Sequence, residues 1–278
     1  RSLSPGGCAG GFGNRSTETR MSDTNVFELF KLEGRVALVT GGSKGLGESM
    51  AVALAQAGAR VVINSRTQSD CDDVANQIHD STGVESVGIS ADITQESAVD
   101  DLFGKVVDRF GRLDVVINSA GINIRHPIEE FPLEEYKKVI DINMIGTWLC
   151  CRAAGRIMKP AGRGSVINVS STLGAVGLED RSAYSSSKSG VIGMTRTIAK
   201  EWAEHGVRCN ALCPGPFLTE MNKPLLDQPE RVEKLIRLTA MNRWAEIHEI
   251  RGAALFLASD ASSYVTGSEL YVDGGWTC

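Results

Sequence analysis

The chain has 278 residues, of which 42% are hydrophobic and 23% charged, a composition typical of a globular protein with a substantial core. Its formal net charge is −5, and it has no long basic run, which argues against a nucleic-acid-binding surface. No apolar run reaches the roughly 18 residues that a transmembrane helix needs. Composition and charge therefore argue against nucleic-acid and membrane partners.

The seven cysteines are scattered along the chain, and none belongs to a C-x-x-C pair. An odd number of cysteines without a C-x-x-C pair predicts neither a zinc site nor a disulfide framework, so we expect no metal. Free thiols are typical of a reducing compartment. We therefore expect the protein to be cytoplasmic.

Residues 1–27 are predicted to form a disordered tail. The first part is rich in Gly and Ser, lacks periodicity and precedes Met21, which resembles a natural start. We interpret this tail as the remnant of a tag or of a targeting peptide. The three arginines and single acid of its first twenty residues would suit an organelle transit segment, and the sequence leaves that alternative open.

From residue 28 onward, short apolar runs alternate with segments of helical periodicity. The predicted strands cover residues 35–40, 60–65, 85–90, 113–118, 164–170, 207–213 and 268–273. The predicted helices cover residues 46–58, a polar stretch to about 80, 95–110, 134–159, 182–205 and 247–258. This alternation predicts an α/β fold over 28–278: a single Rossmann-type, doubly wound domain with a seven-stranded parallel sheet and helices on both faces. Ligands of such sheets bind beyond the carboxyl ends of the strands.

A glycine-rich loop, "TGGSKGLG" (40–47), follows the first predicted strand. Its glycines, Gly41, Gly45 and Gly47 among them, allow a tight turn and let the backbone approach a pyrophosphate. The helix that begins there presents free N–H groups and the positive end of its dipole. A simple turn would also contain glycines. The position between a strand and a helix is the one that dinucleotide binding requires.

The end of the second predicted strand, "NSRT" (64–67), bears on the choice of dinucleotide. An acidic residue there would bind the ribose 2′-OH of NAD(H), whereas a basic one would pair with the 2′-phosphate of NADP(H). The segment has Arg66 and no acid, and Lys44 in the glycine loop is a second cation that could reach the same phosphate. Either could instead be a solvated surface charge. Together they favour NADP(H) over NAD(H).

The segment "YSSSK" (184–188) places a phenol and an ammonium four residues apart. On a helix, residues at i and i+4 share a face. A lysine ammonium beside a phenol favours the phenolate, so the pair could be an acid–base device. The spacing alone is equally compatible with a polar helix surface.

With these motifs, the chain from about residue 31 to its end resembles the short-chain dehydrogenase/reductase family. The glycine loop matches the family's TGxxxGxG pattern, and "YSSSK" matches its YxxxK. The segment "NSAG" (118–121) matches NNAG, with Ser119 in place of the usual second Asn. The family's catalytic Ser and helix Asn fall on Ser171 and Asn143. The order and spacing of these motifs are more specific than any one of them.

The resemblance implies a nicotinamide-dependent dehydrogenase/reductase that acts on CH–OH groups. Tyr184 would donate or remove the proton of the substrate oxygen. Lys188 would hold the nicotinamide ribose and, with the cationic nicotinamide, lower the pKa of the phenol by roughly 3 units from near 10. Ser171 would hydrogen-bond the substrate oxygen, and Asn143 would hold a water that connects Lys188 to solvent. Taken singly, Ser171 could be a strand-end cap and Asn143 a packing residue.

The resemblance also implies a set of cofactor contacts along the carboxyl ends of the predicted strands. Besides the glycines, Lys44 and Arg66, this set comprises Ser43, Leu46, Ser65, Asp92, Ile93, Asn118, Ala120, Gly121, Tyr184, Lys188, Pro214, Gly215, Phe217 and Thr219.

We expect substrate contacts from three loops: the one after "NSAG", the one between Ser171 and Tyr184, and the one after Pro214. The first reads "INIRHP" and resembles gluconate 5-dehydrogenases and related sugar-acid oxidoreductases. Its Arg125 could pair with a substrate carboxylate, beside Ser171 and Tyr184 as further substrate contacts. An exposed arginine on a mobile loop is equally compatible with the sequence. A 3-oxoacyl-thioester reductase or a broad ketone reductase fits the remaining motifs as well.

Two other classes of protein share this fold. An NADP(H)-sensing binding module would have lost Tyr184, Lys188 or Ser171, and this chain keeps all three. An epimerase or dehydratase would need a further substrate region, whereas only three residues follow "SELYVDGG". By resemblance we also expect a homotetramer or homodimer that assembles through the predicted helices 134–159 and 182–205.

Overall fold

The structure is a computed structural model that describes residues 25–220, 222 and 227–278. Seven strands form one sheet in the order β3-β2-β1-β4-β5-β6-β7, and every neighbouring pair is parallel. The strands are β1 (Val36–Thr40), β2 (Arg60–Ser65), β3 (Ser86–Ser90), β4 (Val115–Asn118), β5 (Gly164–Val169), β6 (Val207–Pro214) and β7 (Glu269–Val272). The strand order reverses between β1 and β4. A doubly wound sheet binds its ligand in the crevice beyond the carboxyl ends of the strands at such a reversal.

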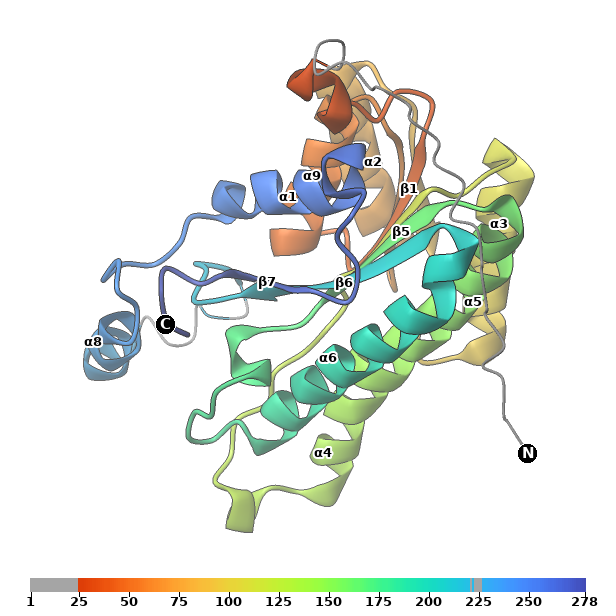
Figure 1. Ribbon diagram of the computed structural model, residues 1–278. Helices are drawn as coiled ribbons and strands as arrows, with labels where there is room; N and C mark the ends of the chain where they lie inside the picture. The colour runs from red at the N-terminus through yellow and green to blue at the C-terminus, as the bar shows by residue number, and fades with distance from the viewer. Residues whose placement is uncertain (1–24, 221, 223–226) are drawn as a thin grey trace, which may run out of the picture.

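Helices cover both faces of the sheet (Figure 1). They are α1 (Gly45–Gln56), α2 (Gln68–Thr82), α3 (Glu96–Phe110), α4 (Leu133–Ile140), α5 (Gly146–Ala161), α6 (Ser182–Trp202), α8 (Pro229–Arg237) and α9 (Arg251–Ala258). One core cluster joins the strands to α1, α2 and α9, and a second joins them to α3, α5 and α6. Every residue of β1 and of β4 is buried, as expected for parallel strands between two helical layers. The predicted fold class is confirmed.

The predicted helix 134–159 is wrong as a single regular helix. The structure interrupts it with a π-helical turn, Asp141–Ile145, between α4 and α5. Such a turn inserts one extra residue into a helix and is frequent at functional sites. The turn contains Asn143, which is fully buried. The sequence analysis also missed α8, whose residues "PERVEKLIR" are mostly polar and bury nothing completely.

The last three residues of the predicted tail, 25–27, lie within the described part of the chain. Asn25 accepts a hydrogen bond from the Phe27 backbone N–H at 3.0 Å and caps a 3-10 helix, Val26–Phe30. Leu32, just beyond it, is completely buried. The rest of the predicted tail, residues 1–24, lies outside the described residues. Within the part of the chain that is described, no helix is both long and apolar enough to cross a membrane.

Candidate active site

The carboxyl ends of the parallel strands surround a cavity of about 810 Å³. It lies beside the reversal of strand order, between the loops that follow β1 and β4. Most of the predicted site residues line this one cavity. They are Gly41, Ser43, Lys44, Gly45, Leu46, Gly47, Ser65, Arg66, Asp92, Ile93, Ala120, Gly121, Ser171, Tyr184, Lys188, Pro214, Gly215, Phe217 and Thr219.

The glycine loop after β1 needs its glycines for steric reasons. Gly41 has a φ of +63°, and a Cβ there would lie 2.7 Å from the Ala120 Cα. A Cβ on Gly47 would lie 2.2 Å from the Gly41 carbonyl oxygen. Both distances are far below van der Waals contact, so these positions exclude side chains. The loop therefore brings the start of α1 against the end of β1, where its free N–H groups face the cavity.

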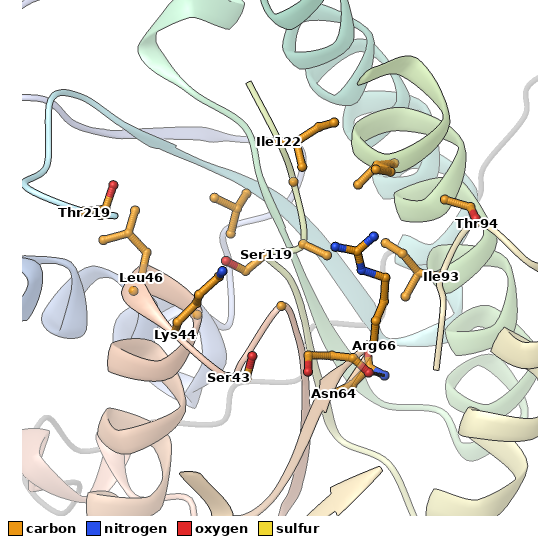
Figure 2. Close-up of a pocket in the computed structure, with 18 of the residues that line it drawn as sticks. Ser43, Lys44, Leu46, Asn64, Arg66, Ile93, Thr94, Ser119, Ile122 and Thr219 are labelled. Atoms are coloured by element: carbon orange, nitrogen blue, oxygen red, sulfur yellow. Dashed lines mark hydrogen bonds between the residues drawn. The ribbon is translucent and has the colours of Figure 1, made fainter. Parts of the chain in front are cut away.

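Two cations extend into the same cavity from separate elements (Figure 2). Lys44 precedes α1, and Arg66 follows β2. Below them, Asn64 donates its side-chain N–H to the carbonyl of Ile89 at 3.0 Å and so holds β2 against β3. The end of β2 has no acid, as the sequence indicated, although Asp70 in the first turn of α2 also lines the cavity.

The loop after β3 is fixed by a turn that Asp92 makes with Thr94. The backbone N–H and the hydroxyl of Thr94 both donate to Asp92 Oδ1, at 2.9 and 2.8 Å. Ile93 is 6% exposed and packs close to Gly146, where a Cβ would lie 2.6 Å from its side chain. The turn thus presents both predicted residues at the cavity wall.

The structure does not place Asn118 in the cavity wall. Its side chain is 2% exposed and donates to Asn168 Oδ1 at 2.8 Å, between β4 and β5. Asn168 in turn donates to Thr195 Oγ1 on α6 at 2.9 Å. Asn118 is therefore part of a buried polar network behind the cavity. The spacing of the motifs alone could not distinguish a residue of this buried network from a cofactor contact, because either role places the residue at the end of β4.

Tyr184 and Ser171 meet inside the cavity. Tyr184 lies in the first turn of α6, and Ser171 follows β5. Burial raises the pKa of Tyr184 above its usual value, whereas its hydrogen bond with Ser171 and the charges of Arg181 and Arg125 lower it. Lys188 is not among the groups that lower this pKa in the protein alone, and the expected joint effect of Lys188 and the cationic nicotinamide stays a prediction. The downward influences come instead from Ser171 and from two arginines.

Ser171 also has the capping role that the sequence left open. Its hydroxyl accepts a hydrogen bond from the Leu173 backbone N–H at 3.1 Å and caps the short 3-10 helix Thr172–Gly174. The cap orients the Ser171 side chain, which is 8% exposed, while the same hydroxyl interacts with the phenol. Capping and contact with Tyr184 are therefore compatible.

Lys188 is almost completely buried, one turn of α6 beyond Tyr184. Its Nζ donates to the Val169 carbonyl at 2.8 Å and lies 5.6 Å from the centre of the Tyr184 ring. Burial lowers the pKa of Lys188 to about 8. A Cβ on Gly121 would lie 3.5 Å from this Nζ, so the loop after β4 closes on the lysine. The ammonium thus faces the cavity between β5 and the ring.

Asn143 lies behind Lys188, outside the cavity wall. Its side chain donates to the Ile122 carbonyl at 2.9 Å and to Ser187 Oγ at 3.1 Å, and it accepts from the Ile122 N–H at 2.8 Å. Its own carbonyl accepts from the Thr147 hydroxyl at 2.8 Å. These bonds tie the loop after β4 to α6 through the π-helical turn. The predicted water-holding role of Asn143 remains a prediction.

Arg125 lies at the edge of the site rather than in the cavity wall. It is half-buried, and it donates to Asn222 Oδ1 at 3.3 Å, while Asn222 itself lines the cavity. Arg181, which no motif indicated, is 7% exposed and acts on the pKa of Tyr184. Its position three residues before Tyr184, at the start of α6, could have indicated that it lies near the phenol.

Comparisons with known proteins agree with this geometry. A family profile described as enoyl-(acyl carrier protein) reductase matches residues 41–277. D-threitol dehydrogenase of Mycolicibacterium smegmatis is 37% identical over 93% of this chain and 99% of its own length. A 3-oxoacyl-[acyl-carrier-protein] reductase of Synechocystis is 37% identical over 88% of this chain and 97% of its own.

A solved structure extends the likeness to three dimensions. It is a gluconate 5-dehydrogenase from Burkholderia cenocepacia in complex with NADP and tartrate. It is 33% identical in sequence, with a TM-score of 0.88 over 91% of this chain and 99% of its own. The profile and these relatives each cover most of the chain. The chain therefore belongs to the short-chain dehydrogenase/reductase family of oxidoreductases.

Proposed function

We propose that the protein transfers hydride between NADP(H) and a carbonyl or secondary alcohol, with Tyr184 as the acid and base. The observation that carries this proposal is the convergence of Tyr184, Ser171 and Lys188 in one cavity with the glycine loop. These groups come from α6, from the end of β5 and from the end of β1, so no local motif alone would bring them together.

The residues present fit a phosphorylated dinucleotide. Gly41 and Gly47 leave room for a pyrophosphate against the start of α1, since a side chain at either position would clash with backbone atoms. Lys44 and Arg66 offer charges for a 2′-phosphate. The related gluconate 5-dehydrogenase structure, which contains NADP, supports the same choice. When bound, the cofactor supplies or accepts the hydride.

The chain's own groups would handle the proton. A phenol whose pKa is raised by burial is protonated at neutral pH and can donate to a carbonyl oxygen as it gains charge. The Ser171 hydroxyl can bind the same oxygen and hold it near the phenol. Arg181 and Arg125, whose charges lower the pKa of Tyr184, would stabilise the phenolate left after donation. Lys188, whose pKa is about 8, is still largely charged at pH 7 and would hold the nicotinamide ribose.

For the substrate we propose a sugar acid, as in gluconate 5-dehydrogenases. Arg125 supports this assignment, because its charge acts on Tyr184 and its side chain contacts Asn222 of the cavity wall. The matching profile and the Synechocystis relative keep a 3-oxoacyl-thioester reductase as the second candidate. A thioester substrate would need an extended apolar path rather than a cation at this position.

The test is a coupled measurement of cofactor and substrate preference. Purified protein is mixed with NADPH or NADH and with 5-ketogluconate, a 3-oxoacyl thioester or a neutral cyclic ketone, and oxidation of the cofactor is followed. We expect turnover with NADPH and the sugar acid. We also expect Arg125→Ala to raise KM for the sugar acid more than for the neutral ketone. An equal effect on both substrates would contradict the assignment of Arg125.

We also propose that the protein assembles into dimers or tetramers through α5 and α6. Trp148 on α5 is 46% exposed, and Ile145 in the preceding turn is 44% exposed. Large apolar groups on a helix surface are suited to burial against another subunit. Light scattering on purified protein would give the mass of the assembly.

A further inference from the structure

The backbone around Arg66 is held on both sides by hydrogen bonds, whereas the Arg66 side chain is not. Before it, the Ser65 carbonyl accepts from the Ala91 N–H at 2.9 Å, which continues the pairing of β2 with β3. After it, the Thr67 carbonyl accepts from the Cys71 N–H at 3.3 Å. Among the described residues, none makes a hydrogen bond or ion pair with the Arg66 guanidinium, which extends into the cavity (Figure 2). The direction of this side chain therefore depends on how firmly its backbone is fixed.

A turn closed by the Ser65 side chain shapes the same segment. The Ser65 hydroxyl accepts a hydrogen bond from the Thr67 N–H at 3.4 Å and lies 3.2 Å from the Thr67 carbonyl oxygen. The same hydroxyl lies 3.1 Å from the Cys71 thiol, which is completely buried. Serine hydroxyls commonly close turns in this way. Arg66 is the middle residue of this turn, so the turn sets where its side chain leaves the backbone.

Gln68, the first residue of α2, fastens this turn to β3. Its side-chain amide donates to the Gly88 carbonyl at 3.0 Å, and its Oε1 accepts from the Ser90 N–H at 2.8 Å. The amide also donates to Asp72 Oδ1, one turn further along α2, at 2.7 Å. These distances are those of good hydrogen bonds. The Gln68 side chain thus uses its donor and its acceptor groups at once, which holds it in one position.

The edge position of β3 makes it a suitable anchor. β3 lies at the end of the strand order and pairs with β2, so its outer edge presents N–H and C=O groups that no neighbouring strand of the described sheet binds. The Gln68 amide binds one carbonyl and one N–H of this edge, as a further strand would. The start of α2 is therefore joined directly to the sheet.

Gly88 lets α2 lie close enough for these bonds. A Cβ at Gly88 would lie 2.4 Å from Asp72 Oδ1 and 2.7 Å from the Asp72 backbone N. Because one of these atoms belongs to the backbone, rotation of the Asp72 side chain would not relieve the clash. The first turn of α2 is therefore packed tightly against β3 at the point where Gln68 binds it.

Gln68 lies behind the cavity wall. Arg66, Thr67 and Asp70 line the cavity, and Gln68 does not. An effect of Gln68 on a bound dinucleotide therefore has to pass through the neighbouring residues that line the cavity. Arg66 is the cation among them, and its charge is the one that suits a 2′-phosphate.

We propose that Gln68 is the positioning residue for Arg66: its amide fixes the turn after β2, so that the Arg66 guanidinium is directed at the 2′-phosphate of NADP(H). The inference rests on the proposed function and deepens its cofactor side. A group that is held in place before binding loses less conformational entropy on binding, which increases the affinity. Gln68 therefore contributes to the preference for NADP(H) without contacting the dinucleotide.

The first experiment tests the anchor in the protein without cofactor. Amide hydrogen exchange is followed by mass spectrometry on peptides that cover residues 65–71 and 86–91. Gln68→Met keeps the length of the side chain and removes the amide. We expect both segments to exchange at least about 3-fold faster in this variant, because local opening becomes easier. Exchange at the wild-type rate in both segments would overturn the proposal.

Gln77→Met is the matched control for this substitution. Gln77 is also on α2, is exposed, and makes no side-chain hydrogen bond with the described residues. The same chemical change is therefore made on the same helix without loss of an anchor. We expect exchange in both segments and affinity for both dinucleotides to stay at the wild-type values.

The second experiment measures the affinity for NADPH and for NADH by the fluorescence of the bound dinucleotide. We expect Gln68→Met to weaken NADPH binding by about 5-fold and NADH binding by less than about 2-fold, because only NADPH carries the 2′-phosphate. A residue that merely stabilises the fold would affect both dinucleotides alike. An equal loss for the two, or no loss for either, would overturn the positioning role.

A double-mutant cycle tests whether the effect passes through Arg66. Added to Arg66→Ala, Gln68→Met should weaken NADPH binding by less than about 2-fold, because the guanidinium that it positions is gone. The same 5-fold loss, roughly, in both backgrounds would mean that the two residues act independently and would contradict the proposal.

The outcomes separate this inference from the proposed function. If Arg66→Ala weakens NADPH binding alone but Gln68→Met weakens both dinucleotides equally, the role of Gln68 is overturned and the assigned cofactor contact stands. If Arg66→Ala weakens both dinucleotides equally, the assigned contact with the 2′-phosphate fails, and the role of Gln68 fails with it. Thermal melts of each variant check that a loss is not caused by unfolding.

Discussion

The two ends of the cavity are built from different parts of the chain. At the cofactor end, strand ends and a glycine loop present backbone groups, and the steric limits at Gly41 and Gly47 come from other backbone atoms. At the substrate end, the loop after β4 and the start of α6 present the charged side chains of Arg125 and Arg181, and Arg181 is buried.

This difference affects how each end can vary. Backbone recognition is set by the sheet itself, so a substitution there disturbs the fold and the binding together. Recognition by side chains on loops can change without disturbing the sheet. We therefore expect variants at the cofactor end to affect every substrate alike and variants at the substrate end to affect some substrates only.

The largest effect is expected where the two ends meet, at Tyr184. Tyr184→Phe removes the proton donor and keeps the ring, so kcat should fall by about 10³-fold. The affinity for NADPH, measured by the fluorescence of the bound dinucleotide, should change little. Turnover at the wild-type rate would show that another group transfers the proton.

A strong effect is also expected at the cofactor end for Gly47→Ala. The new Cβ would meet the Gly41 carbonyl, and strain of roughly 1–3 kcal/mol corresponds to about 5- to 150-fold weaker NADPH binding. Gly104→Ala on α3 is the control, because a Cβ there meets nothing within 4 Å. The control should keep its affinity for NADPH. Similar loss in both variants would contradict the steric account.

A third prediction concerns stability and pH at Lys188. Its pKa is about 8 in the folded protein and 10.5 ordinarily, so the buried charge destabilises the fold below pH 8. Between pH 8 and pH 10.5 the unfolded chain binds more protons at Lys188 than the folded protein does. The contribution of Lys188 to the free energy of unfolding therefore rises with pH. The free energy of unfolding of wild type, minus that of Lys188→Met, should increase by about 2 kcal/mol from pH 7 to pH 10.

Urea unfolding of both proteins across this range measures that difference. The pKa values of buried thiols and of Tyr184 are raised, so these groups make the free energy of unfolding fall as the pH rises. Both proteins contain them, and subtracting one free energy from the other cancels this effect. A difference that stays constant with pH would show that Lys188 keeps an ordinary pKa.

The smallest effect is expected for cofactor choice. Arg66→Ala should weaken NADPH binding by about 10-fold and leave NADH binding nearly unchanged, because only NADPH carries the 2′-phosphate. Arg60→Ala, at the opposite end of the same strand, is the control. Equal loss for the two dinucleotides would mean that Arg66 does not contact the phosphate.

The sequence was informative where the backbone determines the site. The alternation of strands and helices predicted the sheet, and the glycine loop predicted the cofactor end. The sequence was less informative where distant loops converge. Arg181 lies in no motif, and the π-helical turn around Asn143 depends on hydrogen bonds to Ile122 and Ser187, which are remote in sequence. The burial that raises the pKa of Tyr184 could likewise not be judged from the spacing of Tyr184 and Lys188.

The central claim is that this cavity holds NADPH so that its hydride reaches a carbonyl beside Tyr184. The most direct measurement uses NADPH that carries deuterium at both hydrogen positions of nicotinamide C4, and a ketone that the wild-type protein reduces. The account predicts one deuterium on the carbinol carbon of the product and a slower reaction than with unlabelled NADPH. A product without deuterium, or no reduction of any ketone, would contradict it.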